Sequence, residues 1–324
     1  YRDKLAGDLK PYNVSGSLAS MTSTMPANAA RVFEAKAIQA LKAFLVSADT
    51  AVSVQHVTLG GSPVEKTYLT EGEVAQGAAR IWLDMQSMTS GVPMTHDGYL
   101  KLYQLSEPVL RFDDILLDEG QDTNPVLQAI LGAQDGAFTI VGDTHQSIYG
   151  FRGAENAMEG AIYDESHYLT GSFRFGQEVA DVANAVLSLK GEKVALRGLG
   201  RASQVILEPV IDRSGWAFIS RTNSAIFDRA DWAVKRGKPA LFVGGVDTYK
   251  FEVGEDIAQL GLRGPASVRN PMIASFESIE ALSEYAEAVD DVELKGWAKT
   301  VDRFGPSRFL DAARAIRSAA MTYD

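Results

Sequence analysis

The stretch that decides the fold runs from Ile115 to Asp122 and reads Ile-Leu-Leu-Asp-Glu-Gly-Gln-Asp. Its three apolar residues do not alternate with polar ones, which is typical of a short strand covered on both faces of a parallel sheet. Asn124 followed by Pro125 is a favourable helix N-cap and first-turn pair, so we expect a helix over 126–133. A second apolar run over 138–141 predicts the next strand. This order predicts a βαβ unit, and hence a parallel sheet with a right-handed crossover.

A polar loop follows the second strand, in a stretch from Val141 to Ala154 that reads Val-Gly-Asp-Thr-His-Gln-Ser-Ile-Tyr-Gly-Phe-Arg-Gly-Ala. Because ligands of parallel sheets bind at the carboxyl ends of strands, we expect Asp118, Glu119 and Asp143 to lie at one such edge. A metal-bound triphosphate needs a carboxylate near Mg²⁺ and a group beside it that orients water. The pair Asp118-Glu119 suits this chemistry. Taken alone, it equally suits an acidic pair at a helix N-terminus, which is common in α/β proteins.

Composition restricts the class of protein. The 324 residues are enough for two domains, and 46% apolar residues can build sizeable cores. The absence of cysteine excludes a disulfide scaffold and thiolate metal sites. We find no apolar leader at the N-terminus and no run of about 20 apolar residues, so we expect a soluble, cytoplasmic protein. The net charge of −11 argues against a protein that coats nucleic acid, but less against one that confines its basic residues to a channel.

Periodicity predicts the remaining elements. Helical spacing of apolar residues predicts a mainly helical chain from residue 257 onward and helices over 31–48, 73–88, 178–189, 225–235 and 309–321. A strand or extended arm is expected over 51–59, strands over 205–207 and 217–219, and a strand and turn over 241–245. Residues 1–30 show little periodicity and are expected to be mostly loop. We find no internal repeat.

The two stretches resemble motifs II and III of the UvrD/Rep/PcrA-type superfamily 1 DNA helicases, whose patterns read approximately D-E-A-Q-D and G-D-x-x-Q-S-I-Y-x-[FW]-R-G-A. Residues 96–102 and 169–176 most closely resemble the F-box DNA helicase branch. Gly120 stands where the family usually has Ala, a change that we expect to have little effect. The resemblance implies an α/β fold, with RecA-like lobes of the P-loop NTPase type that contain parallel sheets, and with helical accessory subdomains.

The resemblance assigns a nucleotide site residue by residue. Asp118 would ligate Mg²⁺, and Glu119, in indirect contact with the metal, would activate the attacking water. Gln146 would sense the γ-phosphate of ATP and couple it to the DNA site. The segment around Phe173 and Arg174 resembles motif IV, usually N-Y-R-S. Phe173 would cover the adenine, and Arg174 would be the arginine finger that neutralises transition-state charge. A surface salt bridge is the alternative role for Arg174.

The same resemblance predicts contacts with single-stranded DNA. Tyr149 and Phe151 match aromatic positions that stack on bases, and Arg152 matches a DNA-contacting arginine. Base stacking contributes roughly 1–3 kcal/mol per base and tolerates any sequence, as a translocating motor requires. Ordinary core packing is the alternative for the two rings. Arg221 and Asn223 are secondary candidates for DNA contact beside a scaffolding role.

Residues 60–67, Gly-Gly-Ser-Pro-Val-Glu-Lys-Thr, mimic the phosphate-binding pattern G-x-x-x-x-G-K-[ST]. Glu65 occupies the second glycine position, where a carboxylate would repel phosphate and a Cβ would obstruct the tight loop. We therefore predict a turn here rather than a phosphate loop. The histidines show no metal-ligand spacing, so we assign no metal or catalytic role to His56, His96, His145 or His167.

By this resemblance the chain is an internal part of a helicase. The family's phosphate loop, motif I, would precede residue 1, and motifs V and VI would follow residue 324. We therefore expect the chain alone to bind ATP weakly and to turn over negligibly. We expect residues 1–95 to be a mostly helical accessory insertion of the first lobe and 96–160 to be the end of that lobe. Residues 161–250 would begin the second lobe, and 251–324 would form a reduced helical accessory subdomain.

For the intact protein the resemblance implies an ATP-dependent DNA translocase and helicase, with ATP and Mg²⁺ as cofactors. Its partners would be single-stranded DNA and DNA junctions. By family analogy it would move 3′→5′, act as a monomer and associate with the nucleoid, without a membrane. Two alternatives stay open: a non-catalytic DNA- or partner-binding module derived from a helicase, and a helicase fused to a nuclease. The presence of Asp118, Glu119, Gln146 and Arg174 argues against the module, because a decayed ATPase has no physical need to keep all four.

Overall fold

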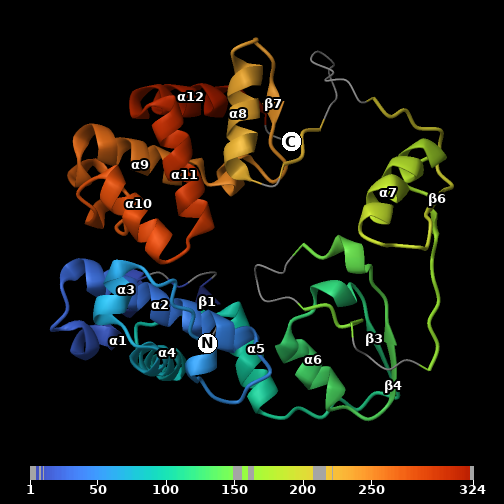
Figure 1. Cartoon of the computed structure of the whole chain (residues 1–324), viewed down its shortest axis with the longest axis horizontal. Helices are drawn as coiled ribbons and strands as arrows, with labels where there is room; N and C mark the ends of the chain where they lie inside the picture. Colours follow the sequence, from blue (N-terminus) through green and yellow to red (C-terminus); the bar gives the residue numbers. More distant parts are fainter. Residues whose placement is uncertain are drawn as a thin grey trace. The chain divides into compact units, whose positions relative to one another are not determined.

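The computed structural model describes residues 5–6, 9, 11–148, 155–159, 164–206, 217–220 and 222–321 (Figure 1). Residue contacts divide the chain into two compact units. The first comprises Tyr1–Gly160 together with Ile219–Asp324, and the second comprises Ala161–Phe218. The first unit contains an N-terminal helical block, a short pair of parallel strands and a C-terminal helical block.

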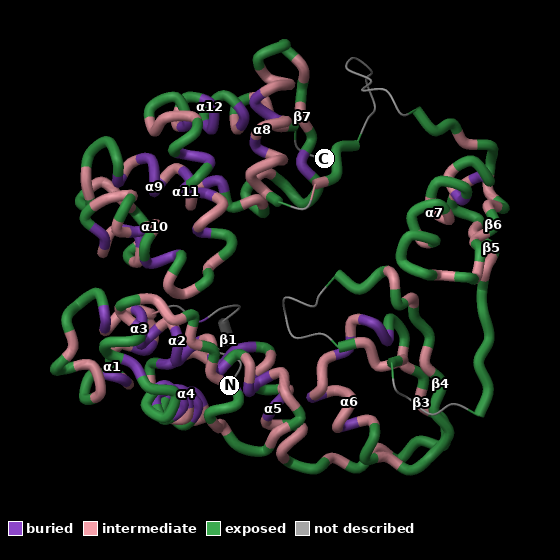
Figure 2. Tube along the Cα trace, in the orientation of Figure 1, coloured by how far each residue is buried: buried purple, intermediate pink, exposed green. Residues whose placement is uncertain are grey.

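Helices dominate the N-terminal block. Its helices are α1 (Pro11–Thr22), α2 (Ala27–Val46), η2 (Val54–His56), α3 (Pro63–Tyr68), α4 (Glu71–Gln86) and α5 (His96–Leu105). The apolar positions predicted for 31–48 and 73–88 line the buried faces of α2 and α4, which pack against each other (Figure 2). At Gly77 an added Cβ would lie 3.1 Å from Phe33 Cζ, so glycine lets the two helices approach closely. Both helix predictions are confirmed.

One prediction for this block is wrong. The sequence predicts mostly loop over 1–30, but α1 forms there, because Val14 and Leu18 lie one turn apart and both are fully buried. The Ser, Asn and Gly residues around them have low helix propensity and mask this spacing. Over 51–59, where a strand or an extended arm is predicted, no strand forms: the segment contains η2, with extended backbone at Ser53 and Val57 on either side. A short parallel pair joins β1 (Leu5–Ala6) to β2 (Met94–Thr95).

The predicted βαβ order is confirmed in one parallel pair of the first unit. Strand β3 (Asp114–Leu117) lies parallel to β4 (Ala137–Ile140), and α6 (Pro125–Gly132) lies between them in sequence. Asn124 Oδ1 accepts a hydrogen bond from Leu127 N at 3.0 Å, as the N-cap of α6. The carboxyl ends of β3 and β4 therefore lie side by side.

The burial of this strand pair differs from the prediction. The sequence predicts that β3 is covered on both faces, whereas Leu116 is 77% exposed and Phe138 on β4 is 42% exposed. Successive side chains of a strand point to opposite faces. In β3 the exposed residues alternate with Ile115 and Leu117, which are half-buried. The described residues therefore do not cover both faces of β3, although its apolar run does not alternate.

The second unit is small. It holds β5 (Gly171–Ser172), α7 (Gln177–Leu189) and β6 (Arg197–Gly198), and β5 and β6 are parallel. Asn184 ties α7 to the chain before β6, since its side chain exchanges hydrogen bonds of 2.9 and 2.8 Å with the backbone of Leu196. The helix predicted over 178–189 is confirmed. The strands predicted over 205–207 and 217–219 are not formed: the described residues there are irregular, and Leu207 lies outside them.

The C-terminal block is helical, as predicted from residue 257 onward. Its elements are α8 (Asn223–Val234), β7 (Ala240–Leu241), η6 (Val246–Tyr249), α9 (Phe251–Arg263), η7 (Pro265–Ser267), η8 (Ile273–Ser275), α10 (Ile279–Ala288), α11 (Val292–Phe304), α12 (Pro306–Ala319) and β8 (Ala320–Met321). Aromatic rings fill its core, where Phe227 and Phe309 stack at 4.5 Å between centroids. The strand and turn predicted over 241–245 are found, since β7 pairs with β8 and a turn follows at 243–244. In the described part of the chain no helix combines the length and apolarity needed to cross a bilayer.

Candidate functional site

The carboxyl end of β3 continues directly into Asp118 and Glu119, and both residues are exposed. Glu119 has a left-handed backbone, with φ 53° and ψ 44°, ahead of the 3-10 turn η3 (Gly120–Asp122). This conformation costs a non-glycine residue roughly 1–2 kcal/mol. Asp118 Oδ1 accepts a hydrogen bond from Glu119 N at 2.9 Å. The chain therefore turns sharply after the strand and keeps two carboxylates at its exposed end.

Gln121 connects the ends of the two strands. Its residue exposure is 1%, in contrast to the exposed acids before it. Gln121 Nε2 donates to Glu119 Oε2 at 2.7 Å, and Gln121 Oε1 accepts from Asp143 N, in the loop after β4, at 2.9 Å. One buried amide thus fixes the Glu119 carboxylate relative to the neighbouring loop.

The loop after β4 extends this chain of hydrogen bonds. Asp143 Oδ1 accepts from His145 N at 2.9 Å and caps the short turn η4 (Thr144–Gln146). Asp143 Oδ2 accepts from Gln146 Nε2 at 2.7 Å. Continuous hydrogen bonding therefore joins Glu119 to Gln146 through Gln121 and Asp143. Two side chains that the sequence places in different motifs belong to one polar network.

Two glycines allow the strand ends to approach this closely. An added Cβ at Gly142 would lie 2.5 Å from Gln121 Oε1, and one at Gly120 would lie 2.5 Å from Ile140 Cγ2. The expectation that Gly120 is interchangeable with Ala is wrong in this packing, because the branched side chain of Ile140 fills the space that the methyl group would need.

The second unit carries the other predicted nucleotide contacts. Phe173 and Arg174 directly follow β5, and Phe173 is 81% exposed. Arg174 is exposed as well, and its backbone N donates to Ser172 Oγ at 3.3 Å. The structure thus brings Asp118, Glu119 and Gln146 together in the first unit and presents Phe173 and Arg174 at the surface of the second.

The predicted DNA contacts Tyr149, Phe151 and Arg152 lie outside the described residues, as does Arg221. Asn223 is described and begins α8.

Comparison with known proteins agrees with the motifs. Residues 103–163 match the family model of the UvrD/REP helicase N-terminal domain. F-box DNA helicase 1 of Gallus gallus is 31% identical over 306 residues, which cover 87% of this chain and 30% of that protein. F-box DNA helicase protein 1 of Schizosaccharomyces pombe is 36% identical over 167 residues, or 49% of this chain and 19% of that protein.

DNA helicase II of Escherichia coli is 31% identical over 154 residues, or 43% of this chain and 20% of that protein. This chain is similar to UvrD/Rep helicases and carries the match to their N-terminal domain. It spans less than a third of the length of each of these relatives. The UvrD/Rep helicase family implies the P-loop NTPase fold, and the described structure of this chain contains short parallel strand pairs among helices.

The donor set at β3 fits the metal that UvrD/Rep helicases use with ATP. No group of three or more His, Cys, Asp or Glu residues in the described part of the chain could hold a metal ion by itself. Mg²⁺ does not need such a cage, because it is usually bound by one or two carboxylates together with water and substrate phosphates. Asp118 and Glu119 supply carboxylates at an exposed strand end. They suit a metal that arrives on a nucleotide.

In the stretch that mimics a phosphate loop, the backbone N–H groups bond to a side chain of the same stretch. Glu65 is 1% exposed and accepts from Gly60 N at 3.2 Å and from Ser62 N at 2.8 Å. Burial alone would raise the pKa of Glu65, but the hydrogen bonds from Ser62, Lys36 and Gly60 hold it below its usual range. The carboxylate occupies N–H groups of the kind that a phosphate would use. Residues from Pro63 onward form α3 rather than the predicted turn.

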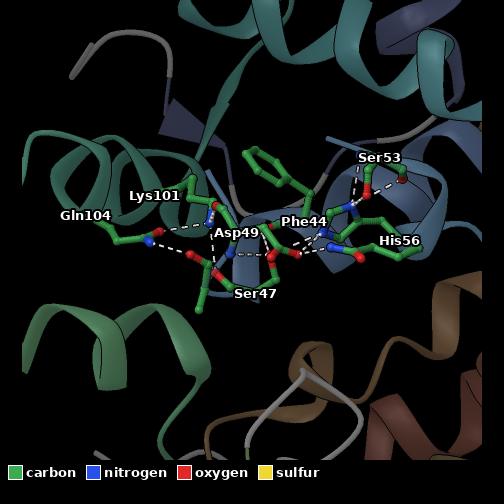
Figure 3. A network of polar contacts seen from close by, with 9 residues as sticks. Phe44, Ser47, Asp49, Ser53, His56, Lys101 and Gln104 are labelled. Carbon is green, nitrogen blue, oxygen red and sulfur yellow. Dashed lines mark hydrogen bonds and ion pairs between the residues drawn. The ribbon is translucent and has the colours of Figure 1, made fainter. Parts of the chain in front are cut away.

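A buried lysine anchors α5, whose first residues resemble the F-box helicase branch (Figure 3). Lys101 is 0% exposed, and its ammonium donates to Ser47 O at 2.8 Å, Asp49 O at 2.6 Å and Gln104 Oε1 at 2.8 Å. It also lies 4.4 Å from the centroid of the Phe44 ring. Burial lowers the pKa of Lys101 to about 8. The cation stabilises the carboxyl-terminal end of α2, where backbone carbonyls lack helical partners.

His56 completes this network (Figure 3). Its Nε2 lies 2.9 Å from Asp49 Oδ2 and 3.2 Å from Ser47 Oγ, and its ring packs edge-on against Phe44 at 5.5 Å. These contacts are those of a packed structural histidine, so the network holds the chain ahead of η2 against α2 and α5.

Sequence reasoning missed Gln121 and Lys101 as positioning residues. Both are polar residues that the structure buries almost completely. Gln121 lies between two acidic residues in the motif, and Lys101 lies at helical spacing among the apolar residues of α5. Such residues can be sought in a sequence as polar residues at positions where the apolar spacing predicts burial, because buried polar groups need hydrogen-bond partners.

Proposed function

We propose that this chain contributes motifs II, III and IV to an ATP-dependent helicase that translocates along single-stranded DNA. The observation that carries the proposal is the hydrogen-bonded chain from Glu119 through Gln121 and Asp143 to Gln146. A motor must transmit the state of its nucleotide to its DNA site. A continuous polar network between the ends of two parallel strands suits that task, because a shift at one end changes the hydrogen bonds at the other.

Each side chain of the strand ends has a distinct task in this proposal. Bound Mg²⁺ neutralises charge on the phosphates. Asp118 holds the metal, and Glu119 orients the attacking water and accepts its proton. The exposed position of both carboxylates supports these tasks. Gln146 contacts the γ-phosphate, and its hydrogen bond to Asp143 passes the change to the loop that leads toward Tyr149, Phe151 and Arg152, which contact DNA.

The second unit completes the site in this proposal. Arg174 reaches the γ-phosphate and neutralises charge that develops in the transition state. Phe173 covers the adenine, and its 81% exposure supports a role in covering a ligand.

The proposal extends to the organisation of the intact protein. Residues 1–95 are an accessory insertion of a first RecA-like lobe, and 96–160 are the end of that lobe. Residues 161–250 begin a second RecA-like lobe, and 251–324 form a reduced helical subdomain. The intact protein is monomeric, moves 3′→5′, acts on single-stranded DNA and DNA junctions, and works at the nucleoid.

The test uses the protein encoded by the complete gene. We expect ATP hydrolysis that single-stranded DNA stimulates, and unwinding of a duplex with a 3′ tail but not of one with a 5′ tail. Gln146→Leu keeps the size of the side chain, and we expect it to retain nucleotide binding while losing DNA stimulation. DNA binding without any ATP hydrolysis would instead support a non-catalytic DNA-binding module. Preferential unwinding from a 5′ tail would contradict the polarity alone.

A further inference from the structure

The short turn η4 (Thr144–Gln146), which carries Gln146, follows β4 (Figure 1), and none of its residues is buried. Ser147 and Ile148 after it are exposed as well. A turn without buried side chains gains little from apolar packing, so its hydrogen bonds determine where its backbone lies. The proposed function needs Gln146 in a defined place, and it therefore depends on the groups that hold this turn.

Two consecutive side chains hold the two ends of the segment that contains η4. Before the turn, Gln121 Oε1 accepts from Asp143 N at 2.9 Å. After the turn, Asp122 Oδ1 accepts from Ile148 N at 3.2 Å. Both acceptors belong to η3, the turn that follows the exposed carboxylate pair. The segment is thus tethered at each end to the neighbouring strand end.

The tether at Ile148 is directly connected to Glu119. Asp122 N donates to Glu119 O at 2.9 Å, while the side chain of Asp122 accepts from Ile148 N. Within η4, Gln146 N donates to Asp143 O at 2.9 Å. A displacement of either end of the segment therefore changes the position of Gln146 relative to Glu119.

A third segment binds the same two turns. Asn156 Nδ2 donates to Thr144 Oγ1 in η4 at 3.3 Å, and Ala157 N donates to Gly120 O in η3 at 3.0 Å. These bonds support one arrangement of the two turns from a second side. Asp122 is the side chain that secures the end after Gln146.

We propose that Asp122 is a positioning residue of the ATP site, which holds Gln146 in place through its hydrogen bond to Ile148. The inference rests on the proposed function, because it needs Gln146 as the contact that couples the γ-phosphate to DNA. It assigns a task to the last carboxylate of the stretch from Ile115, which the proposed function leaves unused. Asp122 does not touch the nucleotide, so its loss should affect the response of hydrolysis to DNA rather than nucleotide binding.

The experiment uses the protein encoded by the complete gene and measures kcat for ATP hydrolysis with and without saturating single-stranded DNA. For Asp122→Ala we expect the DNA-stimulated kcat to fall about 10- to 100-fold, because a displacement of about 1 Å at a reacting site can cost that much. The Kd for nucleotide should stay within about twofold, since no contact with the nucleotide is lost. Asp122→Asn keeps an acceptor oxygen and should restore the stimulation.

Stability is the readout that separates positioning from a structural role. Ile148 is 66% exposed, so water can replace the lost acceptor, and the urea midpoint of Asp122→Ala should change little. Asp122→Ser serves if Asp122→Ala impairs folding, since serine suits a turn but its side chain is one bond shorter. The matched control is Asp135→Ala, which deletes the same side chain at an exposed position before β4 and should leave kcat unchanged.

A double variant tests whether Asp122 acts through Gln146. The stimulation of Asp122→Ala/Gln146→Leu should match that of Gln146→Leu alone, because residues that act as one unit do not contribute additively. Losses that add in the double variant, or equal losses in Asp122→Ala and Asp122→Asn, would overturn the positioning role.

The same measurements separate this inference from the proposed function. Normal stimulation in Asp122→Ala beside a loss in Gln146→Leu would overturn the inference alone. Normal stimulation in Gln146→Leu would overturn the proposed task of Gln146, and the inference with it.

Discussion

Glu119 and Glu65 occupy two stretches that both resemble nucleotide-binding patterns, yet the structure treats them in opposite ways. Glu119 is exposed at the end of β3, and the buried amide of Gln121 holds its carboxylate. Glu65 is 1% exposed, pairs with Lys36 at 3.0 Å and accepts from the backbone of the loop around it. The first carboxylate remains accessible to a ligand. The second carboxylate already bonds to groups of its own chain.

The difference separates an accessible carboxylate from a structural one. A buried carboxylate with a cation and two N–H donors has its charge fully compensated, so a phosphate or metal would have to break those contacts to reach it. An exposed carboxylate oriented by one amide needs no such rearrangement, and it costs the fold little to keep it free. The contacts of the carboxylate, rather than its place in a pattern, therefore decide what it can do.

The largest expected effect comes from the group that would complete the exposed site. In the protein encoded by the complete gene, we expect Arg174→Ala to lower kcat for DNA-stimulated ATP hydrolysis by about 10³- to 10⁵-fold, because transition-state charge loses its cation. Arg197→Ala removes another exposed arginine of the same unit, one that donates to Thr170, and should change kcat little. Similar losses in the two variants would show that Arg174 has no special role.

The buried pair should dominate stability instead. Glu65→Leu leaves Lys36 charged, buried and without its carboxylate, so we expect the free energy of unfolding in urea to fall by about 3–5 kcal/mol. Replacing both partners, Lys36→Met with Glu65→Leu, should restore much of this loss. The exposed pair of Arg80 and Asp84, at 3.4 Å, is a matched control, and Arg80→Ala should cost less than about 1 kcal/mol. A loss of stability in Glu65→Leu as small as that in Arg80→Ala would show that the buried carboxylate has no special structural role.

The linking amide should have an intermediate effect. Gln121→Leu keeps the size of the side chain but removes the hydrogen bonds to Glu119 and Asp143. Since outer groups that orient a reactive residue typically contribute 10- to 100-fold in activity, we expect a loss of about that size in kcat. Gln128→Leu, which removes a hydrogen bond to Glu155 O nearby, should leave kcat nearly unchanged. Full activity of Gln121→Leu would show that Glu119 needs no positioning.

The smallest effect concerns pH. Burial lowers the pKa of Lys101 to about 8, below its value in an unfolded chain. Below pH 8 the lysine is protonated in both states, whereas between pH 8 and about 10 the unfolded chain binds more protons. The unfolding free energy of the unmodified chain should therefore rise relative to that of Lys101→Met across this window. A difference that stays constant with pH would show that the three oxygens around Lys101 keep it protonated.

Much of the secondary structure could be predicted from local pattern. The helices α2, α4, α7 and α8 and the βαβ order around Asp118 follow from apolar spacing and from the Asn124-Pro125 cap. Helix α1 could not be predicted, because its stability comes from burial of Val14 and Leu18 by distant residues rather than from propensity. The exposure of Leu116 could not be predicted from sequence either, since it depends on how many strands surround β3.

The candidate site was predictable in its residues but not in its connections. The motifs identify Asp118, Glu119 and Gln146, and the structure places them at neighbouring strand ends. The hydrogen bonds of Gln121 and the tight packing at Gly120 depend on the distance between β3 and β4, which sequence does not contain. The roles of these residues stay predictions until activity is measured.

The most direct measurement exchanges each glutamate for its amide and reads two quantities, kcat for ATP hydrolysis and the free energy of unfolding. For Glu119→Gln we predict a loss of kcat of about 10²- to 10⁴-fold, with nucleotide binding retained and stability nearly unchanged. For Glu65→Gln we predict the reverse, with clear destabilisation and nearly unchanged kcat per folded molecule. Normal turnover in Glu119→Gln, with nucleotide bound, would contradict the proposal that this exposed carboxylate activates the attacking water.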